Sequence, residues 1–437
     1  QLTQSEPVVH SSTRAAADPS ARQLRFAITT TDLTLNWGKE TIIQNLDGEL
    51  FPMIRLSNSE HRIHAEWNPA QPRHLHGTAQ SRVVHALGRA DLTIAFDMGD
   101  FLQLSMESDN LTAQHSFVGD QALPPTTLVM RLVWKPDTEE VAVDGSIGGI
   151  EWTAVGKTDL RTHDVQFRVP MTPLRSVVEL FGEQIPEATN AQIDGDIGLN
   201  ARISGPPWQW AFEPAAKGLS VSGVLPEDFG GDRLQWSRNG QTLVTGPGMG
   251  GWVKLVDAGW LPEAAIAAED IRFRTHPGFD LVAIQEALDA AAYEDRMRGG
   301  STITQQLAKN LFLDGRRTLL RKLRELLFAL DMESSMSKDA ILTLYLNVVE
   351  FGPNIHGIGE ASNAWFIKNP AQLSAREAAF LTSILPAPHM WHKQIRETNR
   401  PPIKRVNEVL NRMRIRGTLD VANHRRSIQE RLRVVPP

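Results

Sequence analysis

The chain has 437 residues, of which 41% are hydrophobic and 22% charged, and this indicates a globular protein of about two or three domains. Its formal net charge of −6 argues against a nucleic-acid binder held by bulk charge. It contains no cysteine, which excludes disulfide scaffolds, thiolate metal sites and cysteine nucleophiles. No apolar run reaches the ~18–20 residues needed to cross a bilayer. Because the chain begins with Gln1 rather than Met, we expect a signal or anchor to have preceded it.

Residues 1–240 have the pattern of a β-rich domain. Short runs alternate between apolar and polar residues, which predicts strands with one buried and one wet face. The runs cover residues 24–29, 92–98, 102–106, 128–134, 165–169 and 191–203. Gly, Pro, Asp and Asn separate them, as expected of turns. Residues 173–181 are the exception and are expected to form one short helix.

The pattern changes to helical spacing after Gly251. Leucines between 319 and 330 recur on one face of a helix, and a second amphipathic helix is expected over residues 341–349. Residues 238–251 are rich in Gly, Pro and Asn and are expected to form a linker. The sequence therefore predicts two domains, 1–240 and 245–437.

Polar residues gather in the second domain in four short segments. Glu269 and Asp270 follow an apolar helical segment, where partial burial would raise a carboxyl pKa and suit a proton acceptor. Gly299 and Gly300 precede Ser301 and Thr302, either of which can cap the next helix, whose N-terminus favours anions. A cap alone does not account for the polar side chains that follow, which are Thr304, Gln305, Gln306 and Lys309.

The third and fourth segments carry further charged and polar residues. Arg321 and Glu325 are four residues apart on a helix, so a surface ion pair is the simple alternative to a functional role. Lys338 begins the helix that carries Tyr345 and Asn347.

Together the four segments resemble the motifs of the peptidoglycan glycosyltransferase family, glycosyltransferase family 51. This family includes the monofunctional transglycosylases and the transglycosylase domain of bifunctional penicillin-binding proteins. Four motifs are complete and in the family order: Glu-Asp-x-x-Phe-x-x-His-x-Gly from Glu269, Gly-Gly-Ser-Thr-Ile-Thr-Gln-Gln from Gly299, Arg-Lys-x-x-Glu from Arg321, and Lys-x-x-Ile-Leu-x-x-Tyr-Leu-Asn from Lys338. A fifth motif, at 404–410, has Lys404 in place of Arg. The resemblance covers roughly residues 245–415.

The resemblance implies a fold and a reaction. The fold class would be α+β multidomain, with the β-rich domain followed by a mainly α-helical, lysozyme-like glycosyltransferase domain. The reaction would polymerise lipid II into β-1,4 glycan strands with inversion and release of polyprenyl diphosphate. Two alternatives remain: a non-catalytic envelope scaffold that keeps a lipid II-binding cleft, and a muramidase-type hydrolase, which would not need cations for a diphosphate.

The resemblance also implies roles for single residues. Glu269 matches the general base and Glu325 the second carboxylate, whose role is left open. Lys309 and Arg317 match positions that contact diphosphate. The wider substrate-binding set is Asp270, Ser301, Gln305, Gln306, Lys309, Arg317, Arg321, Lys322 and Asn347. No organic cofactor is expected, and a divalent cation, Mg²⁺ or Mn²⁺, beside Asp270 is compatible with the family.

The partners implied are lipid II, the growing glycan strand, the outer face of the cytoplasmic membrane and transpeptidases or other cell-wall proteins, with no nucleic acid. We therefore expect a location on the periplasmic side of the inner membrane, with a missing N-terminal anchor. Residues 279–298 correspond to a segment that contacts the membrane in the family, although an internal core would explain their apolar side chains equally well. The β-rich half resembles envelope proteins of the AsmA type in its amphipathic strands, and a packed β domain without a ligand is the default.

Overall fold

The computed structural model describes residues 2–3, 8–10, 27–37, 40–51, 53–67, 74–85, 88–114, 116, 118–158, 162–206, 208–238, 240–293, 299–313, 318–435 and 437. Of these residues, it describes the side chains from residue 55 onward except those of 67, 83–85, 88, 238 and 289–293. The chain divides into two compact units. Unit 1 comprises residues 1–182 and 197–215, and unit 2 comprises residues 183–196 and 216–437.

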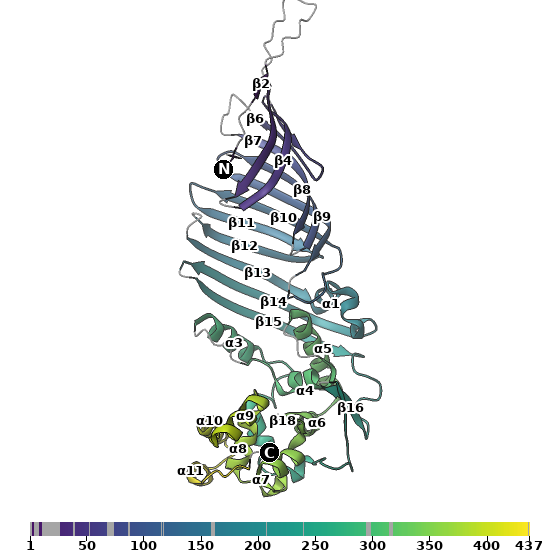
Figure 1. The fold of residues 1–437 in the computed structure, drawn as a ribbon, viewed down its shortest axis with the longest axis vertical. Helices are drawn as coiled ribbons and strands as arrows, with labels where there is room; N and C mark the ends of the chain where they lie inside the picture. The colour runs from purple at the N-terminus through teal and green to yellow at the C-terminus, as the bar shows by residue number, and fades with distance from the viewer. Residues whose placement is uncertain are drawn as a thin grey trace, which may run out of the picture. The chain divides into compact units, whose positions relative to one another are not determined.

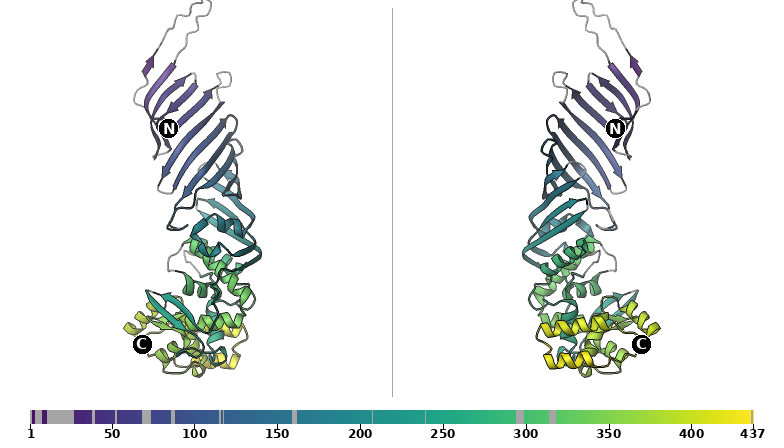
Figure 2. Two further views of the ribbon diagram at one scale, coloured as in Figure 1. Left: turned by 90° about the vertical axis from the view of Figure 1, so that its right-hand side faces the viewer. Right: turned by 90° about the vertical axis from the view of Figure 1, so that its left-hand side faces the viewer.

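Strands dominate the first half of the chain. In the described residues, fifteen strands form one sheet in nearly sequential order, with antiparallel pairing from β3 to β13 (Figure 1, Figure 2). The strands are β1 Leu2–Thr3, β2 Val8–His10, β3 Ala27–Trp37, β4 Glu40–Phe51, β5 Met53–Ser57, β6 His61–Trp67, β7 Leu75–His85, β8 Gly88–Met98, β9 Leu102–Ala113, β10 Thr126–Lys135, β11 Glu140–Ile147, β12 Ile150–Thr158, β13 His163–Pro173, β14 Gln192–Gly205 and β15 Gln209–Ser222. The predicted strands at 92–98, 102–106, 128–134 and 165–169 fall within these elements, and the one at 191–203 begins one residue before β14. Of the run predicted at 24–29, residues 27–29 belong to β3 and residues 24–26 lie outside the described residues. The short helix is α1 Leu174–Glu179.

The pairing register explains why the sequence alternates. Residues paired across neighbouring strands share one face of a sheet. One register row is Leu56, Ile63, Ala79, Ile94, Met106, Met130, Gly145 and Trp152. The row one residue away, on the opposite face, is His64, Thr78, Ala95, Ser105, Arg131, Asp144, Thr153 and Arg168. The predicted division into an apolar and a polar face is thus confirmed.

Unit 2 contains the helices that follow residue 251. They are α2 Leu261–Glu269, α3 Leu281–Tyr293, α4 Ile303–Phe312, α5 Leu319–Ser335, α6 Lys338–Val348, α7 Gly357–Phe366, α8 Ala375–Ile384, α9 Pro388–Thr398, α10 Ile403–Ile415 and α11 Val421–Gln429. The shorter elements are the 3₁₀ turns η1 Gly182–Gln184, η2 Pro186–Ala188, η3 Leu255–Asp257 and η4 Pro370–Gln372, and the strands β16 Leu234–Arg238, β17 Gln241–Thr245, β18 Glu350–Gly352 and β19 Ile355–His356. The α+β architecture expected from the sequence is confirmed at this level.

The core of unit 2 forms around α2, α6 and α8. Ile266, Ile341 and Phe380 have no exposed surface, and α2 and α8 pack against each other. The predicted amphipathic helices correspond to α5 and α6. Side-chain caps fix several helix starts, among them Thr302 for α4 and Ser337 for α6.

The expected linker is partly wrong. Residues 241–245 form β17, which pairs with β16 to make a hairpin in unit 2. Trp236 of this hairpin is buried, with its ring against His356 at a centroid distance of 6.3 Å. The domain boundary near residue 240 stays a prediction, but the compact unit that holds the motifs also includes residues 183–196 and 216–245.

Candidate active site

Glu269 is the last residue of α2 and lies between two other helices. Its Oε2 accepts a hydrogen bond of 2.8 Å from Gln306 Nε2 of α4. The Oε1 of Gln306 in turn accepts a hydrogen bond of 3.1 Å from the Tyr345 hydroxyl of α6. The first, second and fourth motifs therefore meet at one carboxylate.

Burial raises the pKa of Glu269 above its ordinary value. The hydrogen bond from Gln306 and the positive charges of Arg405, Lys309 and Arg412 act in the opposite direction. Partial burial is the condition that the sequence predicted for a proton acceptor. The raised pKa makes Glu269 a better base than an exposed carboxylate.

The second carboxylate, Glu325, lies in the first half of α5 and is 2% exposed. It accepts hydrogen bonds from the Arg321 guanidinium and, at 2.7 Å, from Lys322 Nζ. Lys322 also lies 2.7 Å from Ser301 Oγ in the second motif. The third motif thus places two partly buried cations on a buried carboxylate and is joined to the second motif, unlike the exposed ion pair that helix spacing alone would give.

The pKa of Lys322 is lowered to about 8, chiefly by burial and then by the neighbouring charges of Arg321 and Lys309. An anionic ligand would stabilise the protonated form of this lysine. The cluster around Lys322 therefore has the electrostatics expected of a site for a negatively charged group.

Asp270, which directly follows Glu269, is 6% exposed and has a different set of contacts. Both of its oxygens lie 2.9 Å from His276 Nε2, and Oδ2 also accepts a 2.9 Å hydrogen bond from the Ile303 backbone at the start of α4. Asp270 thereby links the first motif to the N-terminus of α4, where a carboxylate is favourable.

These contacts fit a metal ion poorly. The lone pairs of Asp270 face His276 and the Ile303 amide, and no group of three acidic or His residues in the described part of the chain is arranged to hold a cation. A cation requirement stays a prediction.

Two residues predicted to bind substrate have contacts within the fold. Gln305 is 3% exposed and completes a capping box, in which its Oε1 accepts from the Thr302 backbone at 3.1 Å. Asn347 is 3% exposed and exchanges two hydrogen bonds with the Val253 backbone, at 2.8 and 2.9 Å. Both residues therefore stabilise the fold, and their roles in substrate binding stay predictions.

Gly278, the last residue of the first motif, is required by its backbone. Its φ is +97°, and a Cβ there would lie 2.9 Å from Glu333 Cγ and 3.1 Å from the Ala329 carbonyl of α5. Its carbonyl accepts a 2.6 Å hydrogen bond from the Thr302 hydroxyl. A side chain at this position would push α5 away from the first two motifs.

Comparison with known proteins agrees with this geometry. A model of the transglycosylase family matches residues 252–414. A biosynthetic peptidoglycan transglycosylase from Shewanella amazonensis is 42% identical over 167 residues, which cover 38% of this chain and 67% of that protein. The chain belongs to the transglycosylase family.

The matches to two other relatives cover a smaller share of those proteins. Biosynthetic peptidoglycan transglycosylases from Thiobacillus denitrificans and Pasteurella multocida are 47% and 52% identical over 137 and 125 residues. The matches cover 31% and 29% of this chain, and 59% and 51% of the two relatives. The chain thus spans little more than half the length of these two transglycosylases.

The family motifs did not identify every charge around Glu269. Arg412 donates to the carbonyls of Ala267 and Ala268, at 3.3 and 3.1 Å, at the C-terminal end of α2. Arg405 of the fifth motif lies on the same helix, seven residues earlier. This spacing of two helical turns is the signal that could have paired them. Arg317 lies outside the described residues.

The helix expected to contact the membrane is α3. Val282 is 52% exposed, and none of the described side chains from Leu281 to Leu288 is fully buried. The other apolar side chains of this stretch, including Leu281, Ile284 and Leu288, are partly buried, so the membrane contact stays a prediction. Within the described residues, no helix combines the length and the apolar character that a membrane span needs.

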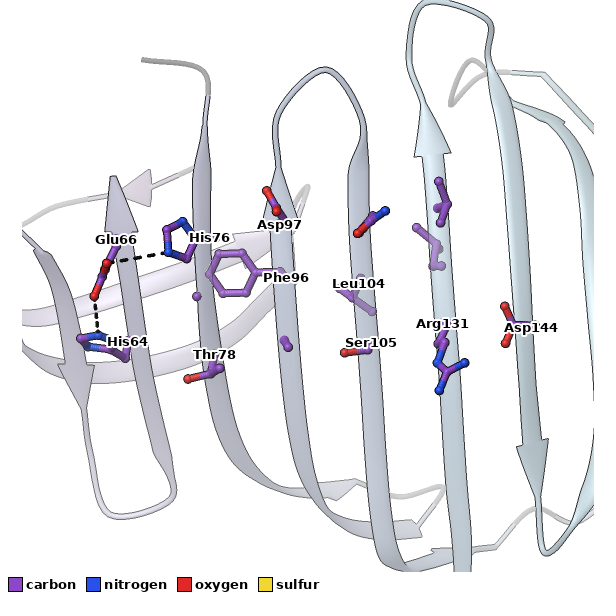
Figure 3. Close-up of a pocket in the computed structure, with 15 residues that line it drawn as sticks. His64, Glu66, His76, Thr78, Phe96, Asp97, Leu104, Ser105, Arg131 and Asp144 are labelled. Carbon is purple, nitrogen blue, oxygen red and sulfur yellow. Dashed lines mark ion pairs between the residues drawn. The ribbon is translucent and has the colours of Figure 1, made fainter. Parts of the chain in front are cut away.

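A separate hollow of about 570 Å³ lies on the polar face of the unit 1 sheet. Figure 3 shows its side chains on successive strands, with the Glu66 carboxylate between His64 and His76 at 3.6 and 3.7 Å. These three side chains are about half exposed, so their ion pairs contribute little. None of the motif residues lines this hollow.

Proposed function

We propose that this chain is a peptidoglycan glycosyltransferase. It polymerises lipid II into β-1,4-linked glycan strands with inversion at the anomeric carbon and releases polyprenyl diphosphate. The observation that carries the proposal is Glu269, a partly buried carboxylate that is held by a 2.8 Å hydrogen bond from Gln306 and on which the charges of three cationic side chains act.

In the proposed reaction, Glu269 is the general base. The 4-hydroxyl of the acceptor sugar attacks the anomeric carbon of the donor while its proton passes to Glu269. The bond from that carbon to the diphosphate breaks, and the bonding electrons leave with the diphosphate. Gln306 holds Oε2 of Glu269, so the proton goes to Oε1, which accepts no hydrogen bond from the described residues.

The cations serve the leaving group. Lys309 lies on the same helix as Gln306, and its charge acts on both Glu269 and Lys322. Positive charge placed before the reaction stabilises the diphosphate as it departs. We assign the same role to Lys322 and Arg321. Both donate to Glu325 in the structure, and in the reaction a phosphate oxygen takes the place of that carboxylate as acceptor.

We extend the proposal to the substrates, the fold and the location of the enzyme. Lipid II and the growing strand are its substrates, and α3, with its exposed Val282, faces the outer leaflet of the cytoplasmic membrane. The helical part of unit 2 is proposed to be lysozyme-like. The location is the cell envelope, on the periplasmic side of the inner membrane.

The test is to incubate the full chain with lipid II in detergent and measure glycan polymer by gel electrophoresis. Glu269→Gln removes the proton acceptor and keeps the shape, so polymerisation should fall by ~10²–10⁴-fold or more. Thermal stability should not fall, because a carboxyl whose folded pKa is raised destabilises the fold while it is charged.

Glu263→Gln is the matched control. Glu263 is on the same helix but contacts Arg416, at 3.6 Å, and not Gln306. This variant should keep activity within about twofold of wild type. A wild-type protein that binds lipid II without forming polymer would favour the scaffold alternative, and one that shortens existing glycan would favour the hydrolase.

A further inference from the structure

Tyr345 is fully buried in α6, yet its hydroxyl is part of the site. It donates to Gln306 Oε1 at 3.1 Å, and Gln306 Nε2 donates to Glu269 Oε2 at 2.8 Å. The two hydrogen bonds join three helices in one line that ends at the proposed base.

The chemistry of the three groups fixes the direction of both bonds. A carboxylate only accepts, so the NH₂ group of Gln306 must face Glu269. The amide oxygen then faces Tyr345, whose hydroxyl must donate. The phenol keeps its proton, because burial raises its pKa well above 10 and the charges of Glu269 and Asp270 add to the effect.

We propose that Tyr345 is a positioning residue of the glycosyltransferase reaction, which acts through Gln306 to hold the carboxylate of Glu269 with one oxygen bonded and the other directed to the acceptor hydroxyl. The inference rests on the proposed function.

Loss of the Tyr345 hydroxyl would leave the Gln306 oxygen without its donor. The amide would then turn more freely, and the hydrogen bond to Glu269 would weaken. The groups that act on Glu269 are Gln306 and Lys309 from α4 and Arg405 and Arg412 from α10. Since the bond from Gln306 lowers the pKa of Glu269, weakening it raises that pKa further.

The experiment compares Tyr345→Phe, Gln306→Met and the double variant in the full chain. For Tyr345→Phe we expect the acid limb of the kcat profile to move up by roughly half to one pH unit, the value of one hydrogen bond. Below that limb kcat should fall about three- to tenfold, with KM little changed. Gln306→Met should shift the limb at least as far, and adding Tyr345→Phe to it should shift the limb no further.

Thr382→Val is the control for removing a buried hydroxyl. Thr382 has no exposed surface, and among the described residues its hydroxyl donates to the carbonyls of Ala378 and Ala379 within α8. This variant should leave the pH profile unchanged even if it lowers stability.

A second readout does not depend on activity. The ¹³C carboxyl signal of Glu269, assigned by its loss in Glu269→Gln, gives the Glu269 pKa without substrate. An equal pKa in wild type and Tyr345→Phe would overturn the inference, as would an equal effect of Tyr345→Phe with and without Gln306. If Tyr345→Phe does not fold, an unshifted pKa in Gln306→Met overturns it alone. If wild type makes no polymer, the proposed function fails while this titration still decides the contact.

Discussion

At the scale of single residues, the site combines two groups whose pKa values move toward each other. Burial raises the pKa of Glu269 and lowers that of Lys322, the latter to about 8. Between the two values Glu269 is charged and can accept a proton, while Lys322 is charged and can hold an anion. The free enzyme should therefore work between an acid limb set by Glu269 and an alkaline limb set by Lys322.

The alkaline limb gives a prediction. Polymerisation, measured as kcat/KM, should fall as pH rises through about 8, because Lys322 then loses its positive charge. The neutral amine can no longer hold an anionic group beside Glu325 and Ser301. In Lys322→Arg the charge persists to higher pH, so the limb should move up even if the rate is lower. An unchanged limb in Lys322→Arg would assign the titration to another group.

Unfolding would not cause this fall in activity. The folded pKa of Lys322 is below the value of 10.5 for an unperturbed lysine. Between these two values the unfolded chain holds more protons, so this group makes the folded state more stable as pH rises. A fall in activity with unchanged or higher melting temperature in this range is the expected combination.

At the scale of elements, α5 has contacts on two sides. Its first turns carry Glu325, and farther along Asp331 accepts from the backbones of Val224 and Leu225, at 2.7 and 2.8 Å. Arg324 pairs with Glu187, and the Ser334 hydroxyl donates to the Val221 carbonyl at 3.1 Å. Residues 183–196 and 216–245 therefore support the helix that carries the second carboxylate.

Asp331 provides a test of this support. It is 4% exposed, so Asp331→Ala should leave two backbone N–H groups without their acceptor and cost roughly 2–4 kcal/mol of unfolding free energy. Asp331→Asn keeps an acceptor oxygen and should cost less. Asp339→Ala is the control, since that exposed carboxylate pairs with Arg274 at the surface and should cost under ~1 kcal/mol. Equal losses in urea denaturation for Asp331→Ala and Asp339→Ala would contradict the role of Asp331.

The sequence predicts local elements better than distant contacts. Helix α5 and strands β8, β9, β10 and β13 were predictable because their neighbouring side chains repeat with periods of about 3.6 and 2 residues. The motif residues were predictable in order, and Glu269 and Gln306 do meet. The β16–β17 hairpin was missed because the Gly-rich composition around it favours a loop. The contact of Asp331 with residues 224 and 225 has no local signal, since it joins positions more than one hundred residues apart.

At the scale of the whole molecule, the question is where the catalytic part begins. Since every motif lies beyond Gly246, the sequence favours a fragment of residues 246–437 that folds and polymerises lipid II alone. The contacts favour an earlier start. Removing residues 216–245 exposes the surface of α4 that packs on β16, removes Phe229 from Phe312 at 5.4 Å, and takes from Asp331 the backbone donors of Val224 and Leu225.

The last prediction compares two fragments, 216–437 and 246–437, by circular dichroism, thermal melting and polymer formation. The longer fragment loses the Glu187 partner of Arg324 but keeps the partners of α4 and Asp331, so it should be folded and active. The shorter one should melt well below it or aggregate, since it exposes an apolar surface of α4 and loses the two hydrogen bonds that join Asp331 to residues 224 and 225. Equal stability of the two unmodified fragments would mean that residues 216–245 cover the helices without supporting them, and the catalytic part would then begin at the motifs.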